Sequence, residues 1–201
     1  MKRVITIGRQ FGSGGHEVGV KLAHALDIPY YDKELLKRAA KESGLCEHLF
    51  ESFDERPKSL LYSLAMDPYS FGNLNAPYGT IEQEVFLATF NTVKKAADEG
   101  PCVIVGRCAD YALRDYADSL HLFIYAPLEE RVKRIAKLHD LTPDKAKDMI
   151  NKMDKQRASY YNYYTSKRWG VPASYDFCLD SSQLGVDGTV ELIRYILEKL
   201  G

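Results

Sequence analysis

A strand that runs directly into a glycine-rich turn near the N-terminus constrains this chain more than any other feature. Val4-Ile-Thr-Ile7 is a short β-branched run, typical of a buried strand, and Gly12-Ser-Gly-Gly15 follows it. Apolar residues then recur at helical spacing from His16. Glycines let backbone N–H groups approach an anion, and the N-terminus of a helix adds positive partial charge. The alternative is a tight turn without a ligand. The order of strand, loop and helix favours a phosphate-binding loop formed by Gly12, Ser13, Gly14, Gly15 and His16.

This loop departs from the pattern G-x-x-x-x-G-K-[ST] at three positions. Aligned through Gly14, Arg9 replaces the first glycine, Gly15 replaces the lysine and His16 replaces the Ser or Thr. In phosphoryl transfer the lysine reaches the phosphates and the hydroxyl binds Mg²⁺. Loss of one preorganised charge donor costs about 2.7–4 kcal/mol of transition-state stabilisation. Arg9 is the nearest substitute cation. We expect His16 to start the helix near the phosphate, with metal ligation or general-base work as the alternative.

Strands alternate with helical patterns along the whole chain. Further strands are expected at Ile28–Tyr31, Cys102–Val105, Leu122–Tyr125 and Phe177–Leu179. This order predicts an α/β fold with a mainly parallel sheet, helices on both faces and one domain over residues 1–201. Residues 45–80 are rich in aromatic residues, Pro, Gly and Asn without sustained periodicity. We expect short helices and an irregular loop there, projecting from the sheet.

Two charged residues follow predicted strands, where ligands bind in parallel sheets. Arg107 comes directly after Cys102–Val105 and Gly106, so we expect it to bind a ligand rather than to be a surface charge. Asp32 ends the second strand. Three roles stay open for Asp32: orienting an acceptor hydroxyl, orienting a hydrated Mg²⁺, or capping the next helix.

A cluster of cations lies in the second half of the chain. Arg131 and Arg134 share one face of a helix expected from Leu128 to about Leu138. Arg157 lies on the next helix and converges on the same site if the two helices form a hairpin. Such cations stabilise charge on the equatorial oxygens of a transferred phosphoryl group. A solvated basic face is the alternative.

Composition excludes several classes of protein. The net charge of −1 over 201 residues argues against a nucleic-acid-binding protein. No apolar run approaches the roughly 20 residues of a membrane-spanning helix. We also expect no secretory signal peptide, because residues 1–8 contain no apolar h-region and lead straight into the first strand. The four cysteines are scattered without a C-x-x-C pair, so we expect reduced thiols, no metal site and a cytoplasmic location. The oligomeric state stays unknown. The tyrosines at 160–164 and Trp169 have two possible roles. They would either stack on a base or, as we favour, pack their part of the chain on the body of the protein.

Several motifs together resemble the cytidylate kinase-like family of P-loop kinases. Arg9-Gln-Phe-Gly-Ser-Gly-Gly15 and Pro29-Tyr-Tyr-Asp-Lys-Glu-Leu35 are similar to the family's R-Q-[YF]-G-S-G-G and [FY]-[YF]-D-[RK]-E-L segments. Val105-Gly-Arg107 stands where cytidylate kinases have D-G-R. Ala126-Pro-Leu-Glu-Glu-Arg131 is similar to their A-x-x-E-E-R segment. The closing pattern of the family matches Ala173-Ser-Tyr-Asp176 through Asp187, so the resemblance covers nearly the whole chain.

The resemblance implies a three-layer P-loop NTPase fold with a helical lid at 128–170 and an acceptor-binding flap at 45–80. It implies transfer of the γ-phosphoryl group of ATP to a nucleoside monophosphate or a similar small acceptor, with Mg²⁺ held mainly through phosphates and water. Gly12 to His16 would hold the donor phosphates, and Asp32 and Arg107 the acceptor. The catalytic cations would be Arg9, Arg131, Arg134 and Arg157. Gly15 stands where the pattern has lysine, and Val105 stands where cytidylate kinases have aspartate. These departures also allow a sensor or interaction protein that binds a nucleotide without transferring phosphate.

Overall fold

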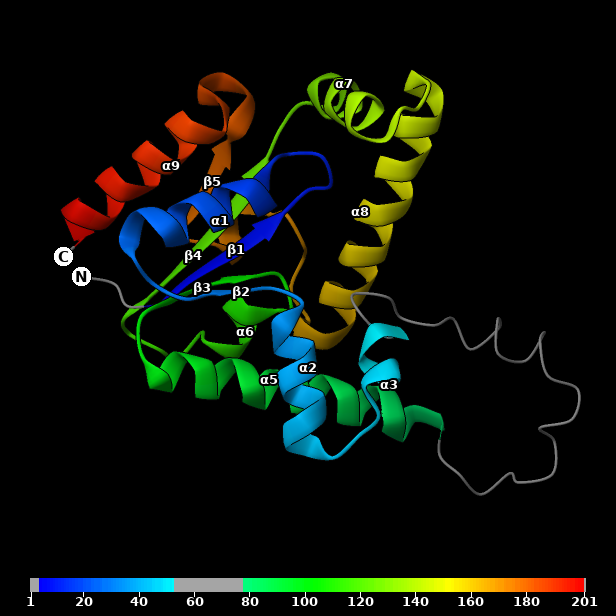
Figure 1. Ribbon diagram of the computed structural model, residues 1–201, viewed down its shortest axis with the longest axis vertical. Coiled ribbons are helices and arrows are strands. Elements are labelled where there is room, and N and C mark those ends of the chain that lie inside the picture. Colours follow the sequence, from blue (N-terminus) through cyan, green and yellow to red (C-terminus); the bar gives the residue numbers. More distant parts are fainter. Residues whose placement is uncertain (1–3, 53–77, 201) are drawn as a thin grey trace, which may run out of the picture.

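The computed structural model describes residues 4–52 and 78–200 (Figure 1). The strands are β1 (Val4–Arg9), β2 (Tyr30–Tyr31), β3 (Cys102–Val105), β4 (Ser119–Tyr125) and β5 (Phe177–Asp180). The helices are α1 (Gly15–Leu26), α2 (Glu34–Ser43), α3 (Glu47–Ser52), α5 (Tyr78–Glu99), α6 (Ala109–Ala112), α7 (Leu128–His139), α8 (Pro143–Thr165) and α9 (Ser181–Leu200). A short 3₁₀-helix covers Pro172–Ser174.

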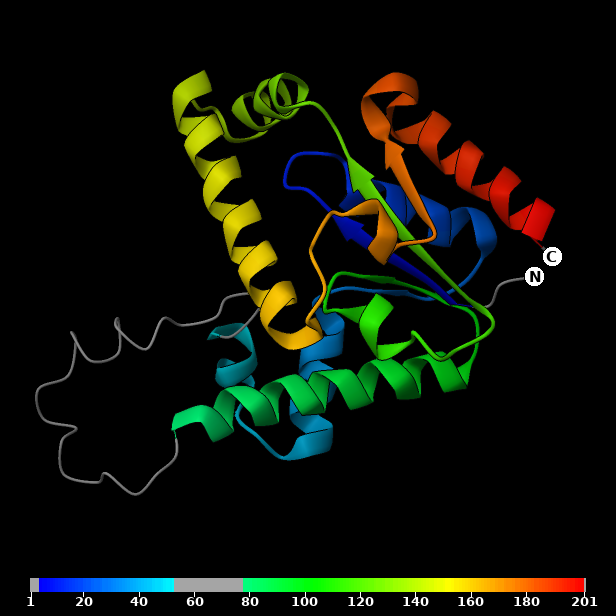
Figure 2. The ribbon, with the colours of Figure 1, turned by 180° about the vertical axis from the view of Figure 1, so that it is seen from behind.

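The strands form one sheet in the order β2-β3-β1-β4-β5, and every paired strand is parallel to its neighbour. Helices α1 and α9 cover one face, and α5 and α6 cover the other (Figures 1 and 2). Ile5 and Ile7 of β1 pack toward α1 and α9, whereas Val4 packs toward α5 and α6. The first strand is β-branched because both of its faces are buried. The expected three-layer α/β fold is confirmed.

Helices α7 and α8 form a hairpin on the side of the sheet toward which the arrow of β1 points (Figure 1). Thr142 caps α8 by accepting a hydrogen bond from the Lys145 N–H, and Pro143 occupies the first turn. Helix α8 continues past Arg157 to Thr165. It continues because no glycine or proline interrupts the chain before Gly170.

The tyrosine-rich end of α8 packs into the body of the protein. Tyr160 and Tyr161 are buried, and the ring of Tyr164 stacks on Phe86 of α5 at a centroid distance of 4.0 Å. Trp169 joins the same cluster. Packing, rather than base stacking, is therefore the arrangement that the structure shows for these rings.

A buried carboxyl group lies within this aromatic cluster and makes stability depend on pH. Asp110 accepts a 2.6 Å hydrogen bond from the Tyr161 hydroxyl, yet burial raises its pKa above the usual 3.8. A raised folded pKa stabilises the fold fully below the unfolded pKa, and that stabilisation is lost as pH rises through the folded value. Asp110→Asn should therefore raise the free energy of unfolding at pH 7 by about 1 kcal/mol. Urea unfolding from pH 4 to 8 measures this, with exposed Asp115→Asn as control. Equal stability of Asp110→Asn and the wild type at pH 7 would contradict it.

Two helices on opposite faces of the sheet differ in continuity. Helix α9 is broken at Gly185, whose φ is 66°, so that one helical turn precedes its main part. Helix α5 begins at Tyr78 and runs to Glu99. Of the flap expected at 45–80, residues 53–77 lie outside the described residues. No helix in the described ranges is long and apolar enough to cross a bilayer.

Candidate functional site

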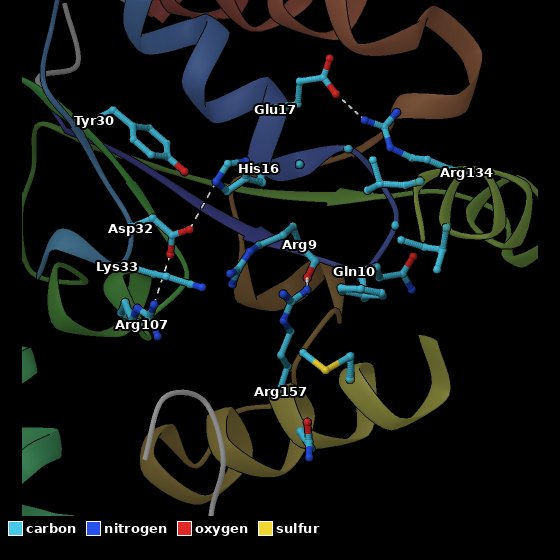
Figure 3. Close-up of a pocket in the computed structure, with 18 of the residues that line it drawn as sticks. Arg9, Gln10, His16, Glu17, Tyr30, Asp32, Lys33, Arg107, Arg134 and Arg157 are labelled. Carbon is cyan, nitrogen blue, oxygen red and sulfur yellow. Dashed lines mark hydrogen bonds and ion pairs between the residues drawn. The ribbon is translucent and has the colours of Figure 1, made fainter. Parts of the chain in front are cut away.

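A cavity of about 1070 Å³ opens where β1, β2 and β3 end (Figure 3). The carboxyl edge of a parallel sheet is where such folds bind ligands. Nine of the residues singled out from the sequence line this cavity: Arg9, Gly12, Gly14, Gly15, His16, Asp32, Arg107, Arg134 and Arg157. Residues more than 140 positions apart in the chain thus share one site. Ser13 and Arg131 do not line it.

The loop between β1 and α1 needs glycine at two positions for both conformation and space. Gly12 has φ 82° and Gly14 has φ 78°, in the left-handed region. A Cβ atom on Gly12 would lie 3.2 Å from the Arg131 Cβ, and one on Gly14 would lie 3.4 Å from the Arg134 Cζ. Helix α7 therefore packs directly on the loop.

Ser13 organises this loop from inside. Its buried hydroxyl donates to the Gln10 carbonyl at 2.9 Å and accepts from the Gly15 N–H at 3.3 Å. Its carbonyl accepts a 2.6 Å hydrogen bond from the Ser181 hydroxyl at the start of α9. Hydrogen bonds within the loop and one from Ser181, far along the sequence, thus fix the path of the loop.

Arg9 occupies the space beside the position where a lysine stands in the G-x-x-x-x-G-K-[ST] pattern. A Cβ atom on Gly15 would lie only 2.5 Å from the Arg9 Cβ, far inside van der Waals contact. Figure 3 shows the Arg9 side chain extending from β1 into the cavity. A side chain at position 15 would therefore collide with Arg9. The replacement of the first glycine by Arg9 and the replacement of the lysine by Gly15 thus belong together as one structural change.

Asp32, Arg107 and His16 lie next to one another on the β2–β3 side of the cavity. Arg107 donates to the Asp32 carboxylate at 3.3 Å, and the His16 Nε2 lies 3.6 Å from the other oxygen (Figure 3). Asp32 and Arg107 are both buried. The residue at the N-cap of α2 is Lys33, with no side-chain cap hydrogen bond. The carboxylate of Asp32 therefore faces the site and does not cap the helix.

The backbone that carries Arg107 is strained. Gly106, Arg107 and Cys108 have φ values of 75°, 61° and 52° in succession. Non-glycine residues rarely adopt this region and cluster at functional sites when they do. Burial lowers the pKa of Arg107 to about 10, and the Asp32 carboxylate opposes that shift. The guanidinium still carries its charge at pH 7.

The three arginines of the helical hairpin lie differently from one another. Arg134 lines the cavity and pairs with Glu17 of α1, and the Arg157 guanidinium donates to the Arg9 carbonyl at 3.1 Å. The side chain of Arg131 is 9% exposed and is held by the Ala126 carbonyl, among other groups. The sequence placed Arg131 and Arg134 on one helix face, but their positions differ by about 60° around the axis, so Arg131 turns inward.

Sequence reasoning missed two lysines of the site. Lys33 and Lys37 of the α2 segment line the cavity, and Figure 3 shows the Lys33 side chain reaching toward the space beside Arg9. Lys33 directly follows Asp32 at the end of β2, which was the available signal. Among the described residues, six Lys or Arg and four Asp or Glu line the cavity. This balance suits an anionic ligand.

A second cavity of about 340 Å³ lies on the other side of the loop. It is lined by Gly12, Ser13, Ala126, Glu130, Lys133, Arg134, Lys137, Ser181, Ser182, Gly185 and Val186. Gly12 and Arg134 line both cavities. The loop of Gly12–Gly15 therefore separates two ligand-sized spaces that meet at Gly12. Across residues 4–52 and 78–200, no cluster of three His, Cys, Asp or Glu is placed to hold a metal ion.

Comparisons with known proteins agree with the fold described above. The sequence model of the cytidylate kinase-like family matches residues 4–183. The chain is 24% identical to a cytidylate kinase of Methanopyrus kandleri, over 98% of this chain and 94% of that one. A solved structure of an uncharacterized protein from Eubacterium ventriosum matches with a TM-score of 0.72 and 30% identity, over 97% and 98% of the two chains. A shikimate kinase from Bacteroides thetaiotaomicron, with a TM-score of 0.56, 14% identity and 97% and 98% coverage, shares the fold.

Proposed function

This chain belongs to the cytidylate kinase-like family, and on that premise we propose that it is a phosphotransferase. It would move the γ-phosphoryl group of ATP to a nucleoside monophosphate or a similar small anionic acceptor. The observation that carries the proposal is the meeting of two cavities at the glycine loop, with Arg134 lining both. Such an arrangement brings a donor and an acceptor to one point and makes their reaction effectively unimolecular.

The donor would lie across the loop. Its nucleoside would occupy the smaller cavity, and its phosphates would reach the larger one over Gly12 and Gly14. The N-terminus of α1 begins at Gly15 and offers its positive end at this place. The acceptor would occupy the larger cavity near Asp32 and Arg107, with Lys33 adding positive charge.

The residues present fit a nucleotide bound with Mg²⁺. The left-handed glycines leave the loop open to phosphate oxygens, and the buried Asp32 carboxylate beside the cavity would be an oxygen donor to the ion or its waters. Among the described residues no cluster of three His, Cys, Asp or Glu forms a protein cage, which suits an ion held mainly through phosphates and water. When bound, Mg²⁺ neutralises developing charge on the phosphates.

The cations of this chain would carry the rest of the chemistry. Arg9, Arg134 and Arg157 lie around one space and would stabilise charge on the transferred group, because preorganised donors act strongly in a site that excludes water. Arg131, which does not line the larger cavity, would hold the loop in place through its hydrogen bond to the Phe11 carbonyl. The α7–α8 hairpin would limit access of water to the donor. Asp32, held by Arg107, would orient the acceptor.

A second candidate function is a nucleotide-binding sensor or interaction protein without turnover. The observation that favours it is the presence of Gly15 and His16 where lysine and a hydroxyl residue stand in the usual pattern. The two functions predict the same nucleotide binding and differ only in phosphoryl transfer.

A coupled assay with ATP, Mg²⁺ and a panel of monophosphates tests the proposal. We expect turnover with at least one acceptor, and an Arg157→Ala variant should lose about 100-fold in kcat because a charge donor is removed. Lys152→Ala, on an exposed position of the same helix, is the matched control and should behave as the wild type. ATP binding measured by calorimetry without turnover on any acceptor would exclude the kinase and favour the sensor.

A further inference from the structure

Asp154 of α8, the lid helix, binds the phosphate loop, which is the segment between β1 and α1. The Asp154 Oδ1 accepts a 2.7 Å hydrogen bond from the backbone N–H of Phe11, and its Oδ2 accepts a 2.6 Å hydrogen bond from Arg131. Its side chain is 18% exposed. Hydrogen bonds to an ionised group are shorter and stronger than neutral ones, and partial burial strengthens them further. Asp154 therefore fixes the position of Phe11 relative to α8.

Arg131 extends this contact to the sheet. Its Nε donates to the Ala126 carbonyl at 3.0 Å, just beyond β4, and its guanidinium also reaches the Phe11 carbonyl at 3.3 Å. The Asp154–Arg131 pair thus joins four parts of the chain: the loop, the end of β4, α7 and α8. Both backbone groups of Phe11 are engaged by this single ion pair.

The same turn of α8 carries a cation into the cavity. Arg157 lies three residues after Asp154, less than one helical turn along α8. It donates to the Arg9 carbonyl and lies over the Phe11 ring, with 5.7 Å between the guanidinium carbon and the ring centroid. Asp154 and Arg157 therefore hold the loop on both sides of Gln10. Any shift of α8 moves Arg157 relative to Arg9.

We propose that Asp154 is a positioning residue that locks the lid helix to the phosphate loop, so that Arg9 and Arg157 are held together around the transferred group. The inference rests on the proposed kinase function. Asp154 itself lies outside the lining of the cavity and acts through Arg131, Phe11 and the placement of Arg157. Misplacement of catalytic groups by about 1 Å costs on the order of 100-fold in rate.

The test is the nearly isosteric variant Asp154→Asn. Its kcat should fall about 100-fold, while the KM values for ATP and for the acceptor stay within about threefold, because binding groups are kept and only their alignment is lost. Asp148→Asn, at an exposed position on the same helix, should keep the wild-type kcat. The double variant Asp154→Asn/Arg131→Gln should lose no more than the worse of the two single variants, since the pair acts as a unit.

Hydrogen exchange gives a readout that does not depend on turnover. The Phe11 amide should exchange faster in Asp154→Asn, while the amides of β1 stay protected. An active wild type whose Asp154→Asn variant keeps its kcat overturns this inference alone. So does an unchanged exchange rate at Phe11, or equal changes in kcat and KM with general loss of protection. A wild-type chain without turnover overturns the proposed function, and this inference falls with it.

Discussion

Replacing Arg9 by alanine is expected to lower kcat by about 100- to 1000-fold, the usual loss when one preorganised charge donor is removed. Arg9 extends from β1 into the cavity and occupies the space beside Gly15, where a lysine stands in the usual pattern. Steady-state kinetics with the best acceptor measure the loss. Arg114→Ala, at an exposed position away from the cavity, is the control.

A swap of the two positions tests the geometry itself. Gly15→Lys alone should destabilise the loop, because its Cβ would lie 2.5 Å from the Arg9 Cβ. Arg9→Gly removes that clash, so Arg9→Gly/Gly15→Lys should recover at least tenfold in kcat over Arg9→Gly alone. A double variant that is no more active than Arg9→Gly would show that Arg9 does not stand in for the lysine.

Arg107→Met is expected to destabilise the fold by about 3–5 kcal/mol, because it leaves the buried Asp32 carboxylate without its guanidinium partner. Adding Asp32→Leu should restore most of that stability, since an apolar pair commonly replaces a buried ion pair without loss. Activity should be lost in both variants, because neither keeps the charges that would bind the acceptor. Urea unfolding and acceptor kinetics together separate the two effects.

The surface pair of Arg38 and Glu99 provides the comparison for this experiment. Arg38→Met removes two partly exposed ion pairs, with Glu99 and with Glu42, and should still cost less than about 1 kcal/mol, with activity unchanged. A double variant at Asp32 and Arg107 that folds and still phosphorylates its acceptor would remove these residues from the proposed site. If the single variant Arg107→Met is as stable as the wild type, then burial of the Asp32–Arg107 pair does not remove its charges from water.

The fold class and the place of the candidate site at the carboxyl edge of the sheet could both be predicted from the residues alone. The β-branched run before Gly12 is decisive because glycine loops that follow a strand and open a helix occur in few contexts. Parallel strands place their carboxyl ends at one edge, so Asp32 and Arg107 could be assigned to a common crevice from their places after strands alone.

Which cations face the cavity and which hold the loop depends on how the helices pack in the folded protein. Arg131 and Arg134 are alike in sequence, yet one is bound by Asp154 and the Ala126 carbonyl while the other lines the cavity. Helical spacing gives a residue's direction around its own axis, but what lies in that direction depends on how helices pack. For the same reason, the contact of Asp154 with Phe11 and the close approach of Arg9 to Gly15 could not be predicted from the sequence. Both contacts join residues that only folding brings together.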